Sequence, residues 1–173
     1  MPTRSFHGIR AIATDVDGVL TDGTFWWSTS GDESKRFSFA DITGIAIARK
    51  AGIHVALISG ESSPAGMALV QRYADKLSLT DVFKGCHDKA GALRQFAQTH
   101  SLELSQVCFV GDDLLDIPAF EVAGVSAAPA DAQPKARAAA HYITRANGGH
   151  GVLREVIDAV LEQNSELSAP KPL

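Results

Sequence analysis

Asp15 and Asp17 directly follow an apolar run, Ile9 to Thr14, whose composition predicts a buried strand. At the carboxyl end of a parallel strand, where ligands commonly bind, two such carboxylates leave the sheet side by side. Gly18 then allows the chain to turn sharply. The pair is costly to hold together unless a cation neutralises it. Mg²⁺ prefers oxygen ligands and often accompanies a substrate phosphate, so the spacing indicates a metal-dependent phosphate site.

Three more groups of polar residues follow apolar strand patterns: Ser59 with Gly60, Lys89, and Asp112 with Asp113 and Asp116. A serine hydroxyl and a glycine N–H suit the oxygens of a phosphate. A lysine near the start of a helix can neutralise both the phosphate and a nucleophilic carboxylate. Taken singly, these groups are more often a turn, a solvated lysine and a helix N-cap. Their joint occurrence in this order predicts a phosphoryl-transfer site.

The stretch from Asp15 to Gly23, Asp-Val-Asp-Gly-Val-Leu-Thr-Asp-Gly, resembles the signature of the haloacid dehalogenase superfamily. The resemblance implies that Asp15 is the nucleophile and Asp17 the acid/base, and that Ser59 and Lys89 bind phosphate. The longer match is similar to one branch, the phosphatases of 3-deoxy-ulosonate sugar phosphates such as 3-deoxy-D-manno-octulosonate (KDO) 8-phosphate. Further matching segments extend the resemblance over about Ile9 to Leu161: Lys35-Arg36-Phe37, Asp41, Gly44-Ile45, Ile117-Pro118 and Gly148 to Glu155.

The chemistry expected of these residues is the hydrolysis of a phosphate ester in two steps. Asp15 would attack phosphorus and form an aspartyl-phosphate. Asp17 would protonate the leaving sugar oxygen and then activate water. Mg²⁺ would bridge the phosphate and Asp15, with Asp112 and the backbone carbonyl of Asp17 as further ligands. One of the two remaining acids, Asp113 or Asp116, would lie beside the site and orient the lysine or a metal-bound water.

Three positions are expected to contact the sugar: Asp41, Glu61 and Arg72. The octulosonate phosphatases usually carry an arginine where this chain has Glu61, and a glutamate cannot clamp a sugar carboxylate as an arginine does. A glutamate at this position is more similar to the sister group that acts on nine-carbon ulosonate 9-phosphates. The alternative is that Glu61 is simply an acid at a helix N-terminus, where the helix dipole favours it. Arg72 is a candidate ligand for the carboxylate. Which sugar phosphate is bound therefore stays open.

The leading hypothesis is a Mg²⁺-dependent phosphatase of the KDO 8-phosphate type, serving the synthesis of lipopolysaccharide. A nonulosonate 9-phosphate phosphatase is the nearest alternative. A non-catalytic oligomerising domain of a sugar-activating system belongs to a different class and would be favoured by loss of the catalytic residues, which are all present. A receiver-like signalling domain also uses an aspartate cluster and Mg²⁺. It lacks an acid/base two residues after the nucleophile.

Length and composition narrow the class of protein further. The 173 residues, 45% of them hydrophobic, suit one domain with a sizeable core. No apolar run approaches the roughly 20 residues of a membrane span, and no signal-peptide pattern begins the chain, so we expect a cytoplasmic protein without a membrane partner. A net charge of −4 without a basic stripe argues against nucleic acid. Cys86 and Cys108 are too few and too far apart for a zinc motif or a redox pair.

Strand and helix patterns alternate along the chain. Beyond the first, strands are predicted at Val55–Ser59, Asp81–Phe83, Val107–Val110, Val125–Ala127 and Tyr142–Thr144. Helices are predicted at Ile42–Ala51, Pro64–Lys76, Asp88–Thr99, Leu115–Ala123 and Ala132–Ala139, with Gly52 and Gly124 as C-caps. The alternation indicates a three-layer, doubly wound α/β fold with a parallel sheet. We expect it to span residues 1–162, followed by a flexible, polar and Pro-rich tail, 163–173.

Residues 24–39 break the alternation and are typical of a β-hairpin with a Ser-Gly-Asp turn. Trp26, Trp27, Phe37 and Phe39 give it more apolar surface than an isolated hairpin can bury. The hairpin either folds back on its own domain or packs against another subunit. We favour the second, because the phosphatases that the chain resembles lack a separate cap domain. The resemblance implies a homotetramer in which such hairpins are shared between subunits.

Overall fold

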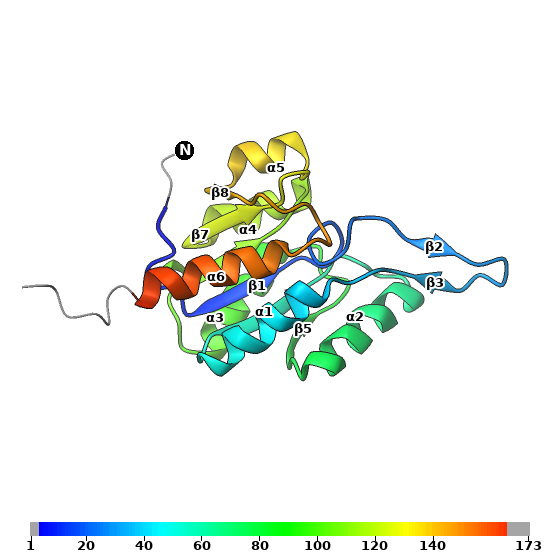
Figure 1. Cartoon of the computed structure of the whole chain (residues 1–173), viewed down its shortest axis with the longest axis horizontal. Coiled ribbons are helices and arrows are strands. Elements are labelled where there is room, and N and C mark those ends of the chain that lie inside the picture. The colour runs from blue at the N-terminus through cyan, green and yellow to red at the C-terminus, as the bar shows by residue number, and fades with distance from the viewer. Residues whose placement is uncertain (1–3, 166–173) are drawn as a thin grey trace, which may run out of the picture.

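Six parallel strands form the central sheet of the structure, a computed structural model that describes residues 4–165 (Figure 1). Their order across the sheet is β5-β4-β1-β6-β7-β8. The strands are β1 (Ala11–Thr14), β4 (His54–Ile58), β5 (Asp81–Phe83), β6 (Val107–Val110), β7 (Val125–Ala128) and β8 (Tyr142–Ile143). Because β1 pairs with β4 on one side and β6 on the other, the residues that follow it leave from the middle of the sheet.

Helices cover both faces of the sheet. Successive side chains of a strand point to opposite faces, and both sets are apolar here, so each face needs a layer of helices to bury it. Ile12 of β1 belongs to a core with the helices α1 (Phe39–Lys50), α2 (Pro64–Leu77) and α6 (Val152–Ser165). Ala11 and Ala13 belong to a second core with α3 (Lys89–Thr99), α4 (Ile117–Val122) and α5 (Pro134–Ala139). Two short 3-10 turns, Leu104–Gln106 and Leu114–Asp116, lie at either end of β6. The predicted three-layer, doubly wound fold is confirmed.

Polar caps set where the helices begin. The Ser38 side chain accepts a hydrogen bond from the backbone N–H of Ala40, so α1 starts at Phe39, three residues before its predicted start. Asp88 caps α3 by accepting from the Gly91 N–H at 2.8 Å. The same cap places Lys89 in the first turn of the helix, facing the carboxyl edge of the sheet.

The two predicted C-cap glycines differ. Gly52 has a φ of +81° and its N–H donates to the Arg49 carbonyl, as expected at the end of α1. The prediction for Gly124 is wrong, since its φ lies outside the left-handed region. A Cβ at Gly124 would lie 2.2 Å from the Ser105 carbonyl oxygen. Glycine is therefore needed there for close approach of two backbones.

The hairpin projects beyond the body of the molecule (Figure 1). Its ladder is short, with antiparallel β2 (Trp26–Trp27) and β3 (Glu33–Ser34) in place of the longer strands expected within residues 24–39. The turn is closed by the Ser28 N–H, which donates to the Asp32 carbonyl. No separate cap domain is evident among the described residues.

The predicted boundary between domain and tail is displaced. Helix α6 continues to Ser165, three residues into the segment 163–173 that was expected to be flexible. Gln163 accepts hydrogen bonds from the Ser5 hydroxyl and the Phe6 N–H, and Asn164 accepts from the Gly8 N–H. These bonds tie the helix end to the N-terminal segment. The rest of the expected tail, 166–173, lies outside the described residues. Among residues 4–165, no helix is both long and apolar enough to cross a membrane.

Candidate active site

Side chains from three strand ends and one helix meet at the carboxyl edge of the sheet. Asp15 follows β1, and its backbone N–H donates to the Val110 carbonyl, which extends the sheet to the site. Gly18 has a φ of +85°, and a Cβ there would lie 2.1 Å from a carboxylate oxygen of Asp112. Only glycine therefore lets the loop after β1 fold against the loop after β6. A cavity of about 330 Å³ opens between them and is lined by Asp15, Asp17, Gly60, Glu61, Lys89, Asp112 and Asp113.

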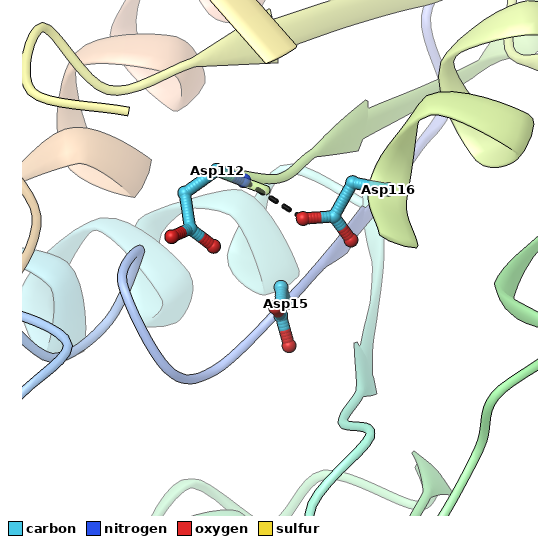
Figure 2. A group of neighbouring side chains, drawn as sticks. All are labelled: Asp15, Asp112 and Asp116. Atoms are coloured by element: carbon cyan, nitrogen blue, oxygen red, sulfur yellow. Dashed lines mark hydrogen bonds between the residues drawn. The ribbon is translucent and has the colours of Figure 1, made fainter. Parts of the chain in front are cut away.

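Three carboxylates cluster at this edge (Figure 2). One oxygen each of Asp15, Asp112 and Asp116 lies within 4.8 Å of the other two. Burial raises the pKa of Asp15. The nearby Lys89 works against this rise, and the nearby Asp116 adds to it. Burial and the neighbouring Asp15 and Asp116 raise the pKa of Asp112 to about 8. A set of hard oxygen donors that repel one another in a confined space fits a divalent cation such as Mg²⁺.

Lys89 is the cation within this group. Its ammonium lies 2.7 Å from Asp15 Oδ2 and 2.6 Å from Asp116 Oδ1, and its side chain is 4% exposed. Burial alone would lower the pKa of Lys89, but the two carboxylates outweigh burial and raise it. The ammonium therefore stays charged beside Asp15, where it can attract an anion that approaches this carboxylate.

Asp116 and Asp113, which were both candidates for orienting Lys89, take different places. Asp116 is fully buried, and its second oxygen accepts from the N–H groups of Asp112 and Asp113 at 2.8 and 3.0 Å. It therefore holds both Lys89 and the loop that carries Asp112. The Asp113 side chain is exposed and caps the 3-10 turn that follows it through the Leu114 N–H.

Ser59 and Gly60 lie at the end of β4, next to Asp15. The Ser59 side chain is fully buried and its hydroxyl accepts from the Glu61 N–H at 3.2 Å. Gly60 lines the same cavity as Asp15 and Lys89. The structure thus brings Ser59, Gly60 and Lys89 together with the carboxylates of the two loops that follow β1 and β6. They are far apart in the chain.

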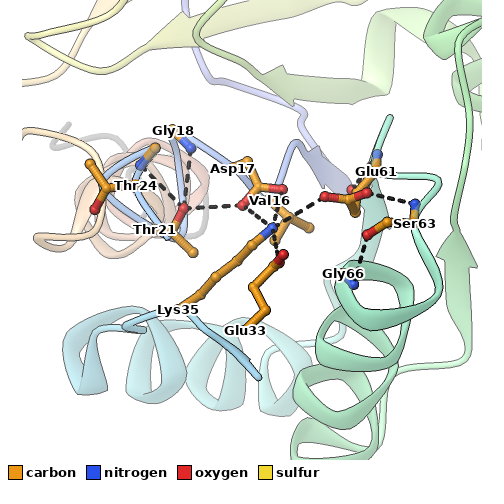
Figure 3. A network of polar contacts seen from close by, with 12 residues as sticks. Val16, Asp17, Gly18, Thr21, Thr24, Glu33, Lys35, Glu61, Ser63 and Gly66 are labelled. Carbon is orange, nitrogen blue, oxygen red and sulfur yellow. Dashed lines mark hydrogen bonds and ion pairs between the residues drawn. The ribbon is translucent and has the colours of Figure 1, made fainter. Parts of the chain in front are cut away.

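Asp17 has a partner that sequence reasoning did not include in the site (Figure 3). The Lys35 ammonium lies 2.9 Å from Asp17 Oδ1 and 3.0 Å from Oδ2. The same ammonium lies 3.6 Å from Glu61 Oε2 and 3.8 Å from Glu33 Oε1. The sequence offers no local signal for this role, and only the fold places the lysine against Asp17. The Asp17 side chain lies outside the cluster of Asp15, Asp112 and Asp116.

Two of the predicted sugar-binding residues do not reach the cavity. Asp41 is fully buried, and its oxygens accept from the N–H groups of Gly151 and Arg154. It therefore caps the start of α6, which corrects the prediction that it contacts the sugar. Arg72 is exposed on α2 and lines a separate hollow of about 380 Å³. Glu61 alone of the three borders the cavity that holds Asp15.

Known proteins are similar to this chain over most of its length. A family model of haloacid dehalogenase-like hydrolases matches residues 69–156. The chain is 37% identical to the KDO 8-phosphate phosphatase of Yersinia pestis, covering 92% of this chain and 83% of the relative. The corresponding phosphatase of Escherichia coli strain K12 is also 37% identical, over 95% of this chain and 86% of the relative.

Solved structures extend the comparison to the fold and to bound groups. The KDO 8-phosphate phosphatase of Moraxella catarrhalis, in complex with magnesium, phosphate and KDO, superposes with a TM-score of 0.86 at 34% identity, covering 94% of this chain and 91% of that one. The cobalt-bound phosphatase of Haemophilus influenzae gives a TM-score of 0.86 at 32% identity, covering 96% and 95% of the two chains. The chain therefore belongs to the haloacid dehalogenase-like hydrolases, in the family of the KDO 8-phosphate phosphatases.

Proposed function

We propose that this protein is a Mg²⁺-dependent phosphatase that hydrolyses a 3-deoxy-ulosonate sugar phosphate of the KDO 8-phosphate type through an aspartyl-phosphate at Asp15. The observation that carries the proposal is the contact of 2.7 Å between Asp15 and the buried ammonium of Lys89. A carboxylate in this position can attack a phosphorus whose oxygens are neutralised by the lysine. The substrate class rests on the relatives, whose names specify KDO 8-phosphate.

The carboxylates divide into those that can bind Mg²⁺ and one that cannot readily do so. Asp15 and Asp112 line the cavity, whereas Asp116 is fully buried and its oxygens are engaged by Lys89 and by two backbone N–H groups. We therefore assign the ion to Asp15 and Asp112, with the backbone carbonyl of Asp17 as a further ligand. When bound, Mg²⁺ would neutralise the phosphate and the attacking carboxylate together.

The residues of the chain would act in two steps. A carboxylate oxygen of Asp15 bonds to phosphorus as the bond from phosphorus to the sugar oxygen breaks, and Asp17 gives its proton to that oxygen. Asp17 then takes a proton from water, which attacks phosphorus and releases inorganic phosphate and free Asp15. Ser59, the Gly60 N–H and Lys89 hold the oxygens that do not react.

Steady-state release of phosphate from a panel of substrates tests the proposal. The panel contains eight- and nine-carbon ulosonate phosphates and simple hexose phosphates, each with and without Mg²⁺. We expect Mg²⁺-dependent release that is fastest with an ulosonate phosphate. Absence of turnover on every ulosonate phosphate would overturn the proposal, and the Asp15→Asn variant measures background hydrolysis.

Glu61 supports a second candidate, a nonulosonate 9-phosphate phosphatase. It borders the cavity, and its carboxylate is held by the Ser63 N–H at 2.7 Å and by Lys35. A fixed acid at this point can accept hydrogen bonds from a hydroxyl or an ammonium group of a sugar, and it repels a carboxylate. A nine-carbon substrate with the higher kcat/KM in the same panel would favour this candidate.

We also propose that the protein is a cytoplasmic homotetramer in which the hairpin is shared between subunits. Trp26 and Trp27 are 71% and 69% exposed in the single chain, and Phe25 beside them is 50% exposed. Neighbouring aromatic surface of this kind marks a contact with another protein surface. Sedimentation or mass photometry at micromolar concentration should give four times the chain mass. A monomer would contradict the shared hairpin.

A further inference from the structure

Lys35 lies on the arm that leads from the hairpin to α1, yet its ammonium reaches Asp17 and Glu61, two residues that line the active-site cavity (Figure 3). The side chain is 4% exposed, and the ammonium contacts both oxygens of Asp17 at 2.9 and 3.0 Å. Three carboxylates surround the ammonium, so a paired positive charge faces the proposed acid/base.

The surroundings of Lys35 show what this charge can contact. The ammonium lies 3.6 Å from Glu61 Oε2 and 3.8 Å from Glu33 Oε1. Together with Asp17, it therefore pairs with three carboxylates. Within the described part of the chain, Glu33 Oε1 has no hydrogen-bond partner, so its burial depends on this ion pair. An ammonium enclosed in this way is not free to receive the carboxylate of a substrate. Its effect must pass through the protein groups that it touches.

Asp17, by contrast, is weakly held by everything else around it. Its side chain is 35% exposed, and among residues 4–165 the one other polar side chain in contact with it is the Thr21 hydroxyl, at 3.4 Å from Oδ1. A contact of that length adds little orientation. Without Lys35, the Asp17 carboxylate could turn about its side-chain bonds into the open cavity.

We propose that Lys35 is a positioning residue for Asp17, fixed by Glu33 and Glu61, that holds the acid/base at the oxygen of the leaving group. The inference rests on the proposed function, in which Asp17 protonates that oxygen. Positioning matters because proton transfer requires hydrogen-bond distance, and a displacement of about 1 Å can cost about 100-fold in rate. Because Lys35 belongs to the arm of the hairpin, the position of the hairpin and proton transfer are coupled.

Leaving groups that differ in their need for a proton test the inference. A sugar phosphate leaves as an alkoxide and needs one, whereas p-nitrophenyl phosphate and acetyl phosphate leave as stable anions. The rate to compare is release of the leaving group in the first turnover, because the second step, in which Asp17 activates water, is common to both kinds of ester. For Lys35→Met we expect this rate to fall about 10- to 100-fold on the sugar phosphate and to change less than about threefold on the activated esters. Equal losses of this rate on both kinds of ester would overturn the positioning role.

Arg36→Met is the matched control, because Arg36 is the next residue of the same arm and its guanidinium contacts Asp22 and His150 instead. It should leave the ratio of rates on the two kinds of ester unchanged. The same ratio in Arg36→Met as in Lys35→Met would mean that any loss of charge on the arm suffices, which contradicts the inference. Thermal unfolding of both variants measures any loss of structure.

Lys35→Gln keeps the test decisive should the methionine variant fail to fold. Glutamine retains similar volume and an N–H donor toward Asp17, so the same dependence on leaving group is expected with a smaller loss. Glu33→Gln adds a second readout, because Glu33 contacts Lys35 and is not among the residues that line the cavity. Its effect on the same rate should disappear when Lys35 is already methionine, because Glu33 acts through Lys35. A full, additive effect of Glu33 would contradict that path.

The two proposals fail in different ways. If the unchanged protein releases phosphate from neither kind of ester, the proposed function is wrong, and the role of Lys35 with it. If the unchanged protein is active and Lys35→Met is equally active on the sugar phosphate, the role of Lys35 alone is wrong.

Discussion

At the carboxyl edge of the sheet, charged side chains are buried and paired, whereas in the hairpin large aromatic side chains face solvent. Lys89 contacts Asp15 and Asp116 in a pocket with little access to water. Trp26 and Trp27, by contrast, are more than two-thirds exposed. Charges that are buried in pairs hold a precise geometry, at a cost in desolvation that function justifies. Exposed aromatic groups leave apolar surface that a second molecule can cover.

The two regions complete the molecule by different means. The loops and α3 at the active edge already place Asp15, Lys89 and Asp116 against one another. The hairpin has few contacts with its own body except at its base, where Lys35 reaches Asp17. We expect changes at the edge to alter chemistry and stability of the single chain. Changes at the hairpin tip should alter assembly.

The largest effect should follow loss of the reacting carboxylates. Asp15→Asn removes the proposed nucleophile and should lower kcat on an ulosonate phosphate by at least about 10⁴-fold. Asp17→Asn should cost about 10²- to 10⁴-fold, as expected for a general acid. Phosphate release in single-turnover and steady-state assays measures both. A rate near that of the unchanged protein in either variant would refute the assigned role.

Lys89→Met should show that the active edge depends on its internal ion pairs. The substitution leaves Asp15 and Asp116 buried beside one another without their cation. Stability should fall by about 3 kcal/mol, the usual order for breaking a buried pair. Urea unfolding without metal measures the change in free energy. A loss below about 0.5 kcal/mol would mean that the two carboxylates do not need the lysine, because they are hydrated or share a proton in the folded chain.

Mg²⁺ should stabilise the folded protein through the same edge. With Mg²⁺ at 100 times its dissociation constant, linkage gives about 2.7 kcal/mol of added stability. Removal of the ion by EDTA should lower the Tm and abolish phosphatase activity together. Asp112→Asn should lose most of the rise in Tm, whereas Asp113→Asn, on an exposed side chain, should retain it. Equal stabilisation of both variants would place the ion elsewhere.

The loop before α6 offers a third region where a carboxylate is held by the protein, far from the chemistry. Burial would raise the pKa of Glu155, but hydrogen bonds from the Arg145 N–H, the Tyr142 hydroxyl and the Ala146 N–H outweigh it and lower that pKa below its usual value of 4.5. Its contribution to stability is therefore full above pH 4.5 and is lost as the pH falls. Glu155→Gln should cost about 1 kcal/mol at pH 7.

Urea unfolding over a range of pH measures this effect. The difference between Glu155→Gln and the unchanged protein should shrink below pH 4.5, where the native carboxylate becomes protonated. A difference that stays constant with pH would mean that the charge of Glu155 contributes nothing.

The smallest change in stability of the single chain should follow substitution of the hairpin tip. Trp26→Ala with Trp27→Ala removes side chains that touch little of their own subunit, so unfolding of a dilute, dissociated sample should change by about 0.5 kcal/mol or less. The molar mass in solution should nevertheless fall if the hairpins build a shared core. Exposed Leu114→Ala serves as a control for loss of an apolar surface residue elsewhere. An unchanged molar mass would contradict the shared hairpin.

Much of the fold could be predicted because local patterns agree with it. The Asp81–Phe83 and Val107–Val110 strands have the bounds that their apolar runs predict, and α3 starts at the residue after its Asp88 cap. Gly124 was misread because its need for glycine comes from Ser105, in another part of the chain. Gln163 was assigned to a flexible tail because its partners, Ser5 and Phe6, belong to the other end of the sequence.

The candidate site, like the fold, could be predicted in part. Asp15, Lys89 and Asp112 each follow or begin an element with a recognisable signal, so their meeting follows from the topology of a parallel sheet. Asp41 lies in a segment that resembles the family and was assigned to the sugar, but its oxygens cap α6. Lys35 was missed because nothing local distinguishes a lysine that reaches an active site from one that is solvated.

The sequence by itself determined the alternation of elements and the order along the chain of the proposed reacting groups, because these depend on residue types and near neighbours. Only the tertiary structure decided that Lys35 holds Asp17, that Asp116 and not Asp113 holds Lys89, and that Asp41 caps a helix. Such partners are separated by up to 113 residues, and packing alone brings them within hydrogen-bond distance. Distances of this kind arise from how helices and loops settle on the sheet, which no local pattern encodes.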